Sequence, residues 1–204
     1  MIPAIVLAAG ASTRMGRPKA LLPAGERTFI RRILETLRAS GIAEAVVVVR
    51  PGDAAIEAEI GAAGYGRAVL NPTPELGQLS SLIAGLDAVD RPSVDAVLVT
   101  LVDVPLIDPG TVRVLCERAA TSRAPIVRAV HRGRHGHPVI FKREVFDPLR
   151  RADAAIGAKA VVRAFPVEDV DIDDPGIAED VDTPDDYRRL ITNRPANPYQ
   201  GSDV

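Results

Sequence analysis

The sequence predicts an α/β protein: a three-layer α/β/α sandwich in which helices cover both faces of a mostly parallel, mixed sheet. Strand-like and helix-like segments alternate through the first 120 residues, which is the pattern of βαβ crossovers. The strand-like runs are uniformly apolar, as is typical of strands buried on both faces. Aromatic residues make up only 3% of the chain and Trp is absent, so Ala, Val, Leu and Ile must build the core.

The expected elements of this first part are given in chain order. The expected strands cover residues 4–9, 45–49, 68–70 and 96–101. Thr28 can cap the first helix, which carries apolar residues at helical spacing and stops at Gly41. Further helices are expected at residues 53–62, 80–88 and 109–120. Asp108 stands at the cap position of the last of these helices, which begins with proline.

Beyond residue 120 the strand-like segments lie closer together, which predicts antiparallel additions to the sheet. Strands are expected at residues 125–130, 138–141 and 165–170, and helices at 143–150 and 158–164. Because proline cannot donate to a sheet ladder, the strand that begins at Pro138 is expected at an edge or a bend. We expect residues 1–192 to form a single α/β domain and residues 193–204 to be a disordered tail.

Charge and composition disfavour several classes of protein. The chain has 25 Lys and Arg against 27 Asp and Glu, whereas a dedicated nucleic-acid binder usually carries a basic excess. No apolar run is long enough to span a bilayer, and the first residues lack the basic region of a signal peptide. The single Cys116 fits a reducing compartment and lies in an apolar pattern that predicts a buried structural thiol. We therefore expect a cytoplasmic protein with no nucleic-acid or membrane partner.

The loop after the first expected strand combines small residues with cations. Gly10 and Ala11 let a ligand approach backbone N–H groups, and Arg14, Arg17 and Lys19 place three positive charges within six positions. Such a set suits a polyphosphate, and a solvated basic loop is the alternative. Neither the dinucleotide fingerprint nor the Walker A pattern fits the glycine spacing, which disfavours an NAD-linked oxidoreductase.

Asp103 follows the apolar run at 96–101 after one residue, Val102. A carboxylate at the end of a buried central strand is unfavourable unless it is paired or bound to a metal, so Asp103 is a candidate Mg²⁺ ligand. Mg²⁺ usually takes one or two carboxylates together with substrate phosphates. The alternative is an ordinary turn aspartate before Pro105.

An acidic region later in the chain, residues 168–186, holds ten acidic residues and no Lys or Arg. Asp180 and Asp182 would point to the same face if the chain is extended, and one of them could complete the Mg²⁺ site; we favour Asp182. Thr183 can cap a following helix whose first turn is acidic, in keeping with the positive helix N-terminus. The region could also be only a solvated stretch.

Two further polar groups have open interpretations. Ser80 and Ser81 lie at the expected start of a helix, where hydroxyls are usually caps. Residues 131–138 hold all three His residues, and the spacing of His135 and His137 would place both on one face of a strand. No third ligand lies at a suitable local spacing, so a zinc site is disfavoured. A basic, Gly-rich turn facing an anionic acceptor fits better.

These segments together resemble a known signature. The resemblance rests on LAAGASTRMGRPK followed by LLP in residues 7–23, ELGQLSSL in 75–82, VLVTLVDVPLI in 97–107, GHP in 136–138 and EDVDTPDDY in 179–187. They resemble the MobA-like nucleotidyltransferases, above all the molybdenum cofactor cytidylyltransferases and their guanylyltransferase relatives. The resemblance implies the Rossmann-like, glycosyltransferase-A-like fold of that family.

The resemblance also implies roles for individual residues. Residues on the nucleotide side would be Leu7, Ala8, Ala9, Gly10, Ala11, Arg14, Lys19, Ser80 and Ser81. Within this set, Leu7 to Gly10 would contact base and ribose, and Arg14 and Lys19 would hold the triphosphate. The catalytic residues would be Arg14, Lys19 and Asp103, the Mg²⁺ ligands Asp103 and Asp182, and the residues near the acceptor Arg134 and His137.

The implied reaction is nucleotidyl transfer, in which a phosphate of the acceptor attacks the α-phosphorus of an NTP and pyrophosphate leaves. The Ala8-Ala9-Gly10 form resembles the cytidine-specific branch, so CTP is expected over GTP. A methyl group at Ala9 is also expected to crowd a purine more than a pyrimidine. The implied acceptor is molybdopterin or molybdenum cofactor, with a molybdoenzyme as a further partner. Transfer to a sugar phosphate or methylerythritol phosphate, and a non-catalytic nucleotide-binding or cofactor-binding chaperone, remain alternatives.

Overall fold

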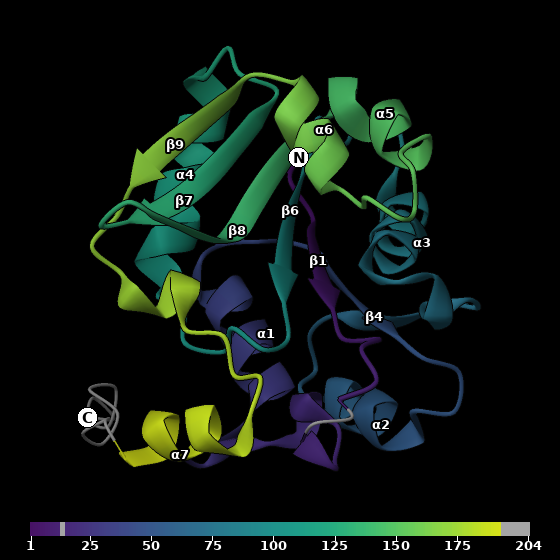
Figure 1. Ribbon diagram of the computed structural model, residues 1–204, viewed down its shortest axis with the longest axis vertical. Helices are drawn as coiled ribbons and strands as arrows, with labels where there is room; N and C mark the ends of the chain where they lie inside the picture. Colours follow the sequence, from purple (N-terminus) through teal and green to yellow (C-terminus); the bar gives the residue numbers. More distant parts are fainter. Residues whose placement is uncertain (13–14, 193–204) are drawn as a thin grey trace.

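The computed structural model describes residues 1–12 and 15–192. Its centre is a seven-stranded sheet in the order β5-β4-β1-β6-β8-β7-β9 (Figure 1). The strands are β1 (Ala4–Leu7), β4 (Ala45–Val49), β5 (Arg67–Leu70), β6 (Ala96–Leu101), β7 (Ile126–His131), β8 (Arg134–Lys142) and β9 (Val167–Asp171). Strands β2 (Pro23–Ala24) and β3 (Arg27–Thr28) form a separate antiparallel pair. The predicted tail, residues 193–204, lies outside the described residues.

Helices connect most of these strands. The α-helices of the described residues are α1 (Phe29–Ala39), α2 (Ala54–Ala62), α3 (Gln78–Val89), α4 (Pro109–Thr121), α5 (Phe146–Arg150), α6 (Lys159–Ala164) and α7 (Pro184–Thr192). The 3-10 helices include η2 (Lys19–Leu21), η4 (Arg143–Val145) and η5 (Pro175–Ala178). None of the helices in the described ranges is long and apolar enough to cross a membrane.

The two faces of the sheet carry two separate cores. Alternate strand residues point to opposite faces, so Val6 and Val47 pack with α1, α2 and α4, whereas Ile5 and Val48 pack with α3, α5 and α6. Figure 1 shows α4 and α3 on opposite sides of the strands. The predicted three-layer α/β/α architecture is confirmed. Cys116 is half-buried against the first core, less enclosed than predicted, and burial raises the pKa of its thiol to about 11.

Strand directions confirm a mostly parallel, mixed sheet. β5, β4, β1 and β6 run parallel to one another, which matches the predicted βαβ crossovers. β8 is antiparallel to both β6 and β7, and β9 is parallel to β7. The late part of the chain therefore supplies the antiparallel addition that its close strand spacing predicted.

The prediction that the strand at Pro138 lies at an edge or a bend is wrong as to the edge. β8 begins four residues earlier, at Arg134, and lies in the interior of the sheet between β6 and β7. Its register with β7 shifts between Arg128 and Val130, opposite the residues just before Val139. Proline lacks an N–H group, but Pro138 lies in this irregular stretch, where the regular ladder is already interrupted.

Local capping chemistry fixes two helix starts as predicted. Thr28 Oγ1 accepts a hydrogen bond from the backbone N–H of Arg31 at 3.3 Å, at the start of α1. Asp108 Oδ1 accepts one from Gly110 N at 2.6 Å, at the start of α4. Each cap satisfies a backbone donor that has no partner inside the helix.

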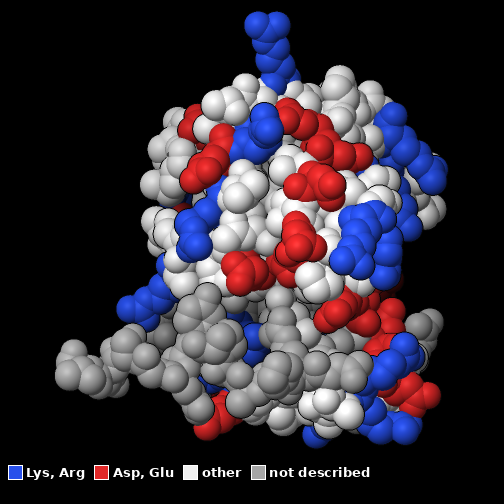
Figure 2. Space-filling view, turned by 90° about the vertical axis from the view of Figure 1, so that its left-hand side faces the viewer, with Lys and Arg blue, Asp and Glu red and all other residues white. Residues whose placement is uncertain are grey.

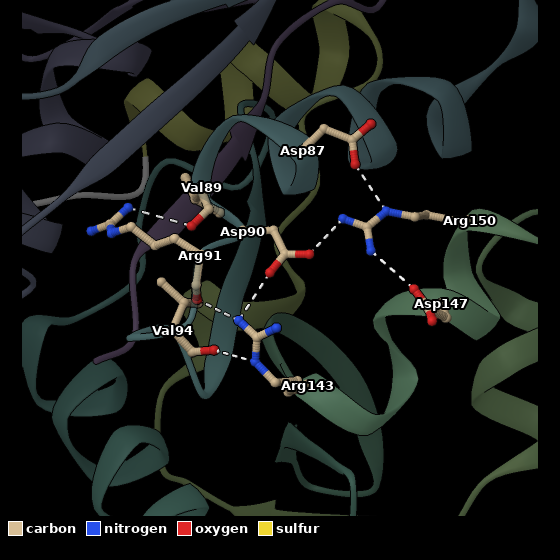
Figure 3. Close-up of polar contacts among 8 residues, drawn as sticks. All are labelled: Asp87, Val89, Asp90, Arg91, Val94, Arg143, Asp147 and Arg150. Carbon is tan, nitrogen blue, oxygen red and sulfur yellow. Dashed lines mark hydrogen bonds and ion pairs between the residues drawn. The ribbon is translucent and has the colours of Figure 1, made fainter.

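An ion-pair network ties the end of α3 to the segment that contains η4 and α5 (Figure 3). Asp90 accepts from Arg143 at 2.9 Å and from Arg150 at 2.7 Å. Arg150 also donates to Asp87 at 2.9 Å and to Asp147 at 3.1 Å. The side chain of Asp90 is 20% exposed, and the arginine hydrogen bonds lower its pKa. The network thus joins two outer helices that are distant in sequence, through charge-assisted hydrogen bonds.

Figure 2 shows the side of the molecule on which β9 lies, with acidic side chains across its middle and basic side chains flanking them. Glu168 pairs with Arg118 at 3.3 Å, and Asp169 pairs with Arg128 at 2.8 Å. The charges of these two carboxylates, at the start of the acidic region, are thus neutralised by neighbouring elements of the fold. The later part of the region, beyond η5, reaches the carboxyl edge of the sheet.

Candidate active site

A hollow of about 390 Å³ opens beside the loop that follows β1. Most of its wall comes from this loop and from η2: Ala8, Gly10, Ala11, Ser12, Gly16, Arg17, Pro18, Lys19 and Ala20. The other wall, at the end of β4 and the start of α2, consists of Arg50, Asp53 and Ile56. The hollow has the volume of a small-molecule site and lies outside the carboxyl ends of parallel strands, where ligands bind in open α/β sheets.

The small residues at the start of the loop divide between the core and the hollow. Ala8, Gly10 and Ala11 line the hollow, whereas Leu7 and Ala9 are 8% and 5% exposed and pack in the core. The methyl group of Ala9 is not part of the wall of this hollow, and its effect on a purine stays a prediction.

The far end of the loop is held by local hydrogen bonds. Lys19 N donates to Ser12 Oγ at 3.1 Å, and Met15 N donates to Ser12 O at 3.0 Å. Ser12 and Gly16 both have positive φ, 48° and 66°, which bends the chain back toward η2. Arg14, predicted to hold the triphosphate, lies outside the described residues.

Lys19 joins the loop to both predicted metal ligands. Its Nζ lies 3.1 Å from Asp103 Oδ2 and 2.5 Å from Asp182 Oδ1. The Lys19 side chain is only 12% exposed, against 22% for Asp103 and 51% for Asp182. The other oxygen of Asp103, Oδ1, is buried and has no hydrogen-bond partner among the described residues. Two predicted groups, the phosphate-binding loop and the acidic pair, therefore meet at one point.

The C-terminal segment is positioned by contacts with two other parts of the fold and by a helix cap of its own. Val181 N donates to the backbone oxygen of Asp103 at 3.0 Å, which sets Asp180 and Asp182 on either side of this contact. Thr183 and Asp186 form a reciprocal cap at the start of α7, with Thr183 N donating to Asp186 Oδ2 at 2.9 Å and Asp186 N to Thr183 Oγ1 at 3.2 Å. Tyr187 Oη then donates to Pro23 O at 2.9 Å and anchors α7 on β2.

Asp180 and His137 lie in the same electrostatic environment as the acidic pair. Desolvation and then the neighbouring carboxylates of Asp103 and Asp182 raise the pKa of Asp180. Burial lowers the pKa of His137, against the effect of its hydrogen bond with Val99 O. Of the two aspartates that the sequence left open, Asp182 is the one that shares an ammonium with Asp103.

The three histidines do not converge. His131 Nδ1 lies 2.9 Å from Ile172 O, and His135 Nε2 lies 3.4 Å from Asp169 Oδ2. Arg134, predicted on the acceptor side with His137, is exposed and donates to Ala178 O at 3.3 Å. In the described ranges no three or more His, Cys, Asp or Glu side chains gather closely enough to hold a metal ion by themselves. A metal here would need ligands from a substrate.

Ser80 and Ser81 lie inside α3 and are not its caps, because the helix begins at Gln78 and Gly77 takes the cap position. Asn71, which follows β5 and is 1% exposed, donates to Ser80 Oγ at 2.9 Å and to Ser81 Oγ at 3.0 Å. Ser80 Oγ in turn donates to the carbonyl of Gly77 at 2.8 Å. The pair is thus part of a polar network centred on the buried Asn71.

Sequence reasoning missed Arg50, Asp53 and Asn71. All three follow the carboxyl end of a strand, Arg50 and Asp53 after β4 and Asn71 after β5. The rule that ligands bind at that edge of an α/β sheet was a signal that could have found them. Arg50 and Asp53 line the hollow on the side of α2, so this wall carries one charge of each sign.

Comparison with known proteins adds independent information. The model of the MobA-like NTP transferase domain matches residues 4–170. Nicotine blue oxidoreductase of Paenarthrobacter nicotinovorans is 35% identical over 201 residues, which cover 92% of this chain and 95% of that protein. Molybdenum cofactor guanylyltransferase of Rhizobium meliloti is 33% identical over 141 residues, 67% of this chain and 61% of that protein.

A solved structure is similar over almost the whole chain. Rv0371c of Mycobacterium tuberculosis H37Rv superposes with a TM-score of 0.82 at 29% identity, covering 95% of this chain and 100% of that one. A second structure of that protein is a complex with manganese, with a TM-score of 0.77 at 29% identity over 95% of this chain and 99% of that one.

Proposed function

The chain belongs to the MobA-like NTP transferase family, and on this basis we propose that it transfers CMP, or GMP, from an NTP to a molybdopterin-type acceptor and releases pyrophosphate. The observation that carries the proposal is the contact of Lys19 with Asp103 and Asp182 at the wall of the hollow. It brings a phosphate-binding loop and an acidic pair within hydrogen-bond distance, as the transfer of a phosphoryl-type group requires.

The residues of the hollow account for binding and orientation of the nucleotide. Backbone around Gly10 and Ala11 lies open to the hollow, and Lys19, Arg17 and Arg50 supply positive charge around it. A phosphate acceptor is already anionic, so the reaction needs no general base. The work of the protein is then to align the attacking oxygen with the α-phosphorus and to neutralise the charge of the leaving pyrophosphate.

Asp103 and Asp182 are the residues that would hold Mg²⁺. The arrangement fits such an ion, because the two carboxylates already share one cation and Asp103 Oδ1 is buried without a partner among the described residues. Two carboxylates with the remaining positions taken by phosphates and water is the usual protein site for Mg²⁺. When bound, the ion would neutralise phosphate charge in the transition state.

We propose CTP as the preferred nucleotide on the resemblance of Ala8-Ala9-Gly10 to the cytidine-specific branch alone. Ser80 and Ser81 are the proposed contacts with the base, held in place by Asn71. His137 and Arg134 are the proposed acceptor-side residues, and a molybdoenzyme is the proposed recipient of the product. The choice of nucleotide and the choice of acceptor share one test, since both depend on the identity of the product.

That test incubates purified protein with Mg²⁺, molybdopterin and either CTP or GTP, and analyses the products by mass spectrometry. The proposal expects pyrophosphate together with an acceptor that has gained one CMP. A preference for GTP would overturn the choice of nucleotide. Parallel reactions with methylerythritol phosphate and sugar phosphates would identify a different acceptor. Full activity of an Asp103→Asn variant in cells would favour a non-catalytic chaperone.

A second candidate is an oxidoreductase, because the relative named nicotine blue oxidoreductase is similar over 92% of this chain. Against it stands the absence of the dinucleotide fingerprint from the loop after β1. The two functions separate in one assay, in which nicotine blue is mixed with protein and NADH or NADPH in the absence of any NTP. Oxidation of the nicotinamide cofactor with loss of the dye's colour would support the oxidoreductase.

A further inference from the structure

Lys19 faces two partners at once. The residue forms part of the wall of the hollow, yet its ammonium group lies between the carboxylates of Asp103 and Asp182. An anionic ligand in the hollow would compete with the carboxylates for the ammonium group, and a cation between the carboxylates would compete with the ammonium group for them. In the described part of the chain, no other Lys or Arg forms an ion pair with either carboxylate.

We propose that the ammonium of Lys19 is a resident counter-ion that keeps a divalent cation out of the Asp103–Asp182 pair until a triphosphate draws it into the hollow. This inference rests on the proposed function, since it takes Asp103 and Asp182 as the metal ligands. Its new content is that the lysine opposes metal binding when nucleotide is absent and supports nucleotide binding when nucleotide is present.

The backbone around Lys19 leaves only the side chain free to move. Lys19 N is bonded to Ser12 Oγ, Leu22 N donates to Lys19 O at 3.0 Å, and Ala20 is 1% exposed in the core. The four-carbon stem of lysine is flexible, so Nζ can exchange carboxylate partners for phosphate partners without a change in the fold. Lys19 contacts both carboxylates and also lines the hollow, so Nζ can reach the aspartates or a phosphate in the hollow from the same Cα position.

The charges at the site explain why metal binding should depend on nucleotide binding. The ammonium of Lys19 forms an ion pair with both carboxylates, at 3.1 Å from Asp103 Oδ2 and 2.5 Å from Asp182 Oδ1. A divalent ion between the carboxylates would meet the positive charge of Lys19, a side chain that is only 12% exposed, at close range. Moving the ammonium away without an anion to receive it would leave it unpaired. A triphosphate removes this obstacle because it supplies the receiving anion.

The experiment measures Mn²⁺ binding by electron paramagnetic resonance in the native protein and in Lys19→Met, with and without CTP and with no acceptor present. Lys159→Met is the matched control, since Lys159 is exposed at the start of α6, on a helix that packs in the other core. Thermal melting shows that each variant is folded, and Lys19→Ala repeats the test with a smaller side chain.

The proposal expects opposite changes in the two affinities. Without nucleotide, Lys19→Met and Lys19→Ala should bind Mn²⁺ more tightly than the native protein, by roughly 5-fold to 150-fold, which is the usual range of coupling between sites. The same variants should bind CTP more weakly, and Lys159→Met should match the native protein in both. If Lys19 only stabilises the fold, its replacement should weaken Mn²⁺ binding and CTP binding together.

Two negative results have different meanings. Equal Mn²⁺ affinity of native protein and Lys19 variants without nucleotide would overturn the counter-ion role while leaving the metal site intact. Absence of Mn²⁺ binding in every protein, with CTP present as well as absent, would overturn the metal site and with it the proposed function.

Discussion

Gly136 in β8 lies so close to η5 that it has no room for a side chain. A Cβ atom on Gly136 would lie 2.1 Å from Ile177 O and 2.6 Å from the carbonyl carbon of Ile177. η5 leads directly into the segment that carries Asp180 and Asp182. A Gly136→Ala substitution should therefore displace this segment from the site as well as strain the fold.

The size of the effect follows from the geometry. Real Cβ contacts are essentially never under 3.0 Å, so the η5 backbone must retreat by 3.0 − 2.1 = 0.9 Å or more. Overpacking of this kind costs about 1–3 kcal/mol. For a domain of this size that lowers Tm by roughly 2–12 °C. A displacement of about 1 Å at a site that must align reacting groups can lower the rate by about 100-fold.

Differential scanning calorimetry and the pyrophosphate-release assay together test this prediction. Gly61→Ala is the matched control, because Gly61 lies in α2, and a Cβ atom added there would have no neighbouring atom within 4 Å. It should keep the native rate and gain up to about 1 kcal/mol of stability from the better helix propensity of alanine. A Gly136→Ala protein with native Tm and native rate would refute the reasoning. A lowered Tm with a native rate would refute the link from Gly136 to the site.

Three further predictions concern individual side chains. Asp103→Asn should lower nucleotidyl transfer by about 100-fold or more, as removal of a charge-stabilising group does, and should also lower Tm because Lys19 loses one of its two ion-pair partners. Asp90→Asn should lose about 1–2 kcal/mol at pH 7, since hydrogen bonds from arginine stabilise the carboxylate. The pKa of Asp90 is lowered by folding, so its contribution is present above pH 3.8 and is lost as the pH falls below that value. The melting curves of native protein and variant should therefore differ at pH 7 and converge in acid. Cys116 should react slowly with a thiol reagent at pH 8, with only about a thousandth of it as thiolate, and rapid labelling of the folded protein would contradict its pKa of about 11.

The sequence predicts those parts of the fold that depend on local patterns. The uniform Val run at Ala45–Val49 favours a buried strand, and Thr28 and Asp108 cap their helices through backbone atoms two or three residues away. Neither feature needs information about distant segments. The interior position of β8 does need it, since the irregular pairing that accommodates Pro138 is set by β7.

The site shows the same division. The position of Asp103 after a central strand and of Lys19 after the first strand predicts that both lie at one edge of the sheet. Their direct contact joins residues 84 positions apart, and the contact with Asp182 joins residues 163 positions apart. A local pattern shows that a lysine is present but not which anion it meets. The sequence accordingly predicts a phosphate partner for Lys19, whereas in the structure the lysine holds the acidic pair.

The carboxylates of the acidic region, residues 168–186, have different partners in the structure. Glu168 and Asp169 pair with Arg118 and Arg128 of neighbouring elements. Asp182, near its far end, contacts the site through Lys19. Charge density along the chain therefore predicts an acidic surface, and the fold alone decides which of its carboxylates reach the site.

The most direct test is a crystal structure with Mn²⁺ and CTP, in which anomalous scattering locates the metal. We expect one anomalous peak between Asp103 and Asp182, the triphosphate in the hollow beside Gly10 and Ala11, and Lys19 turned from the carboxylates to the phosphates. Metal bound away from this pair, or nucleotide bound outside the hollow while Lys19 still contacts both aspartates, would contradict the proposed site.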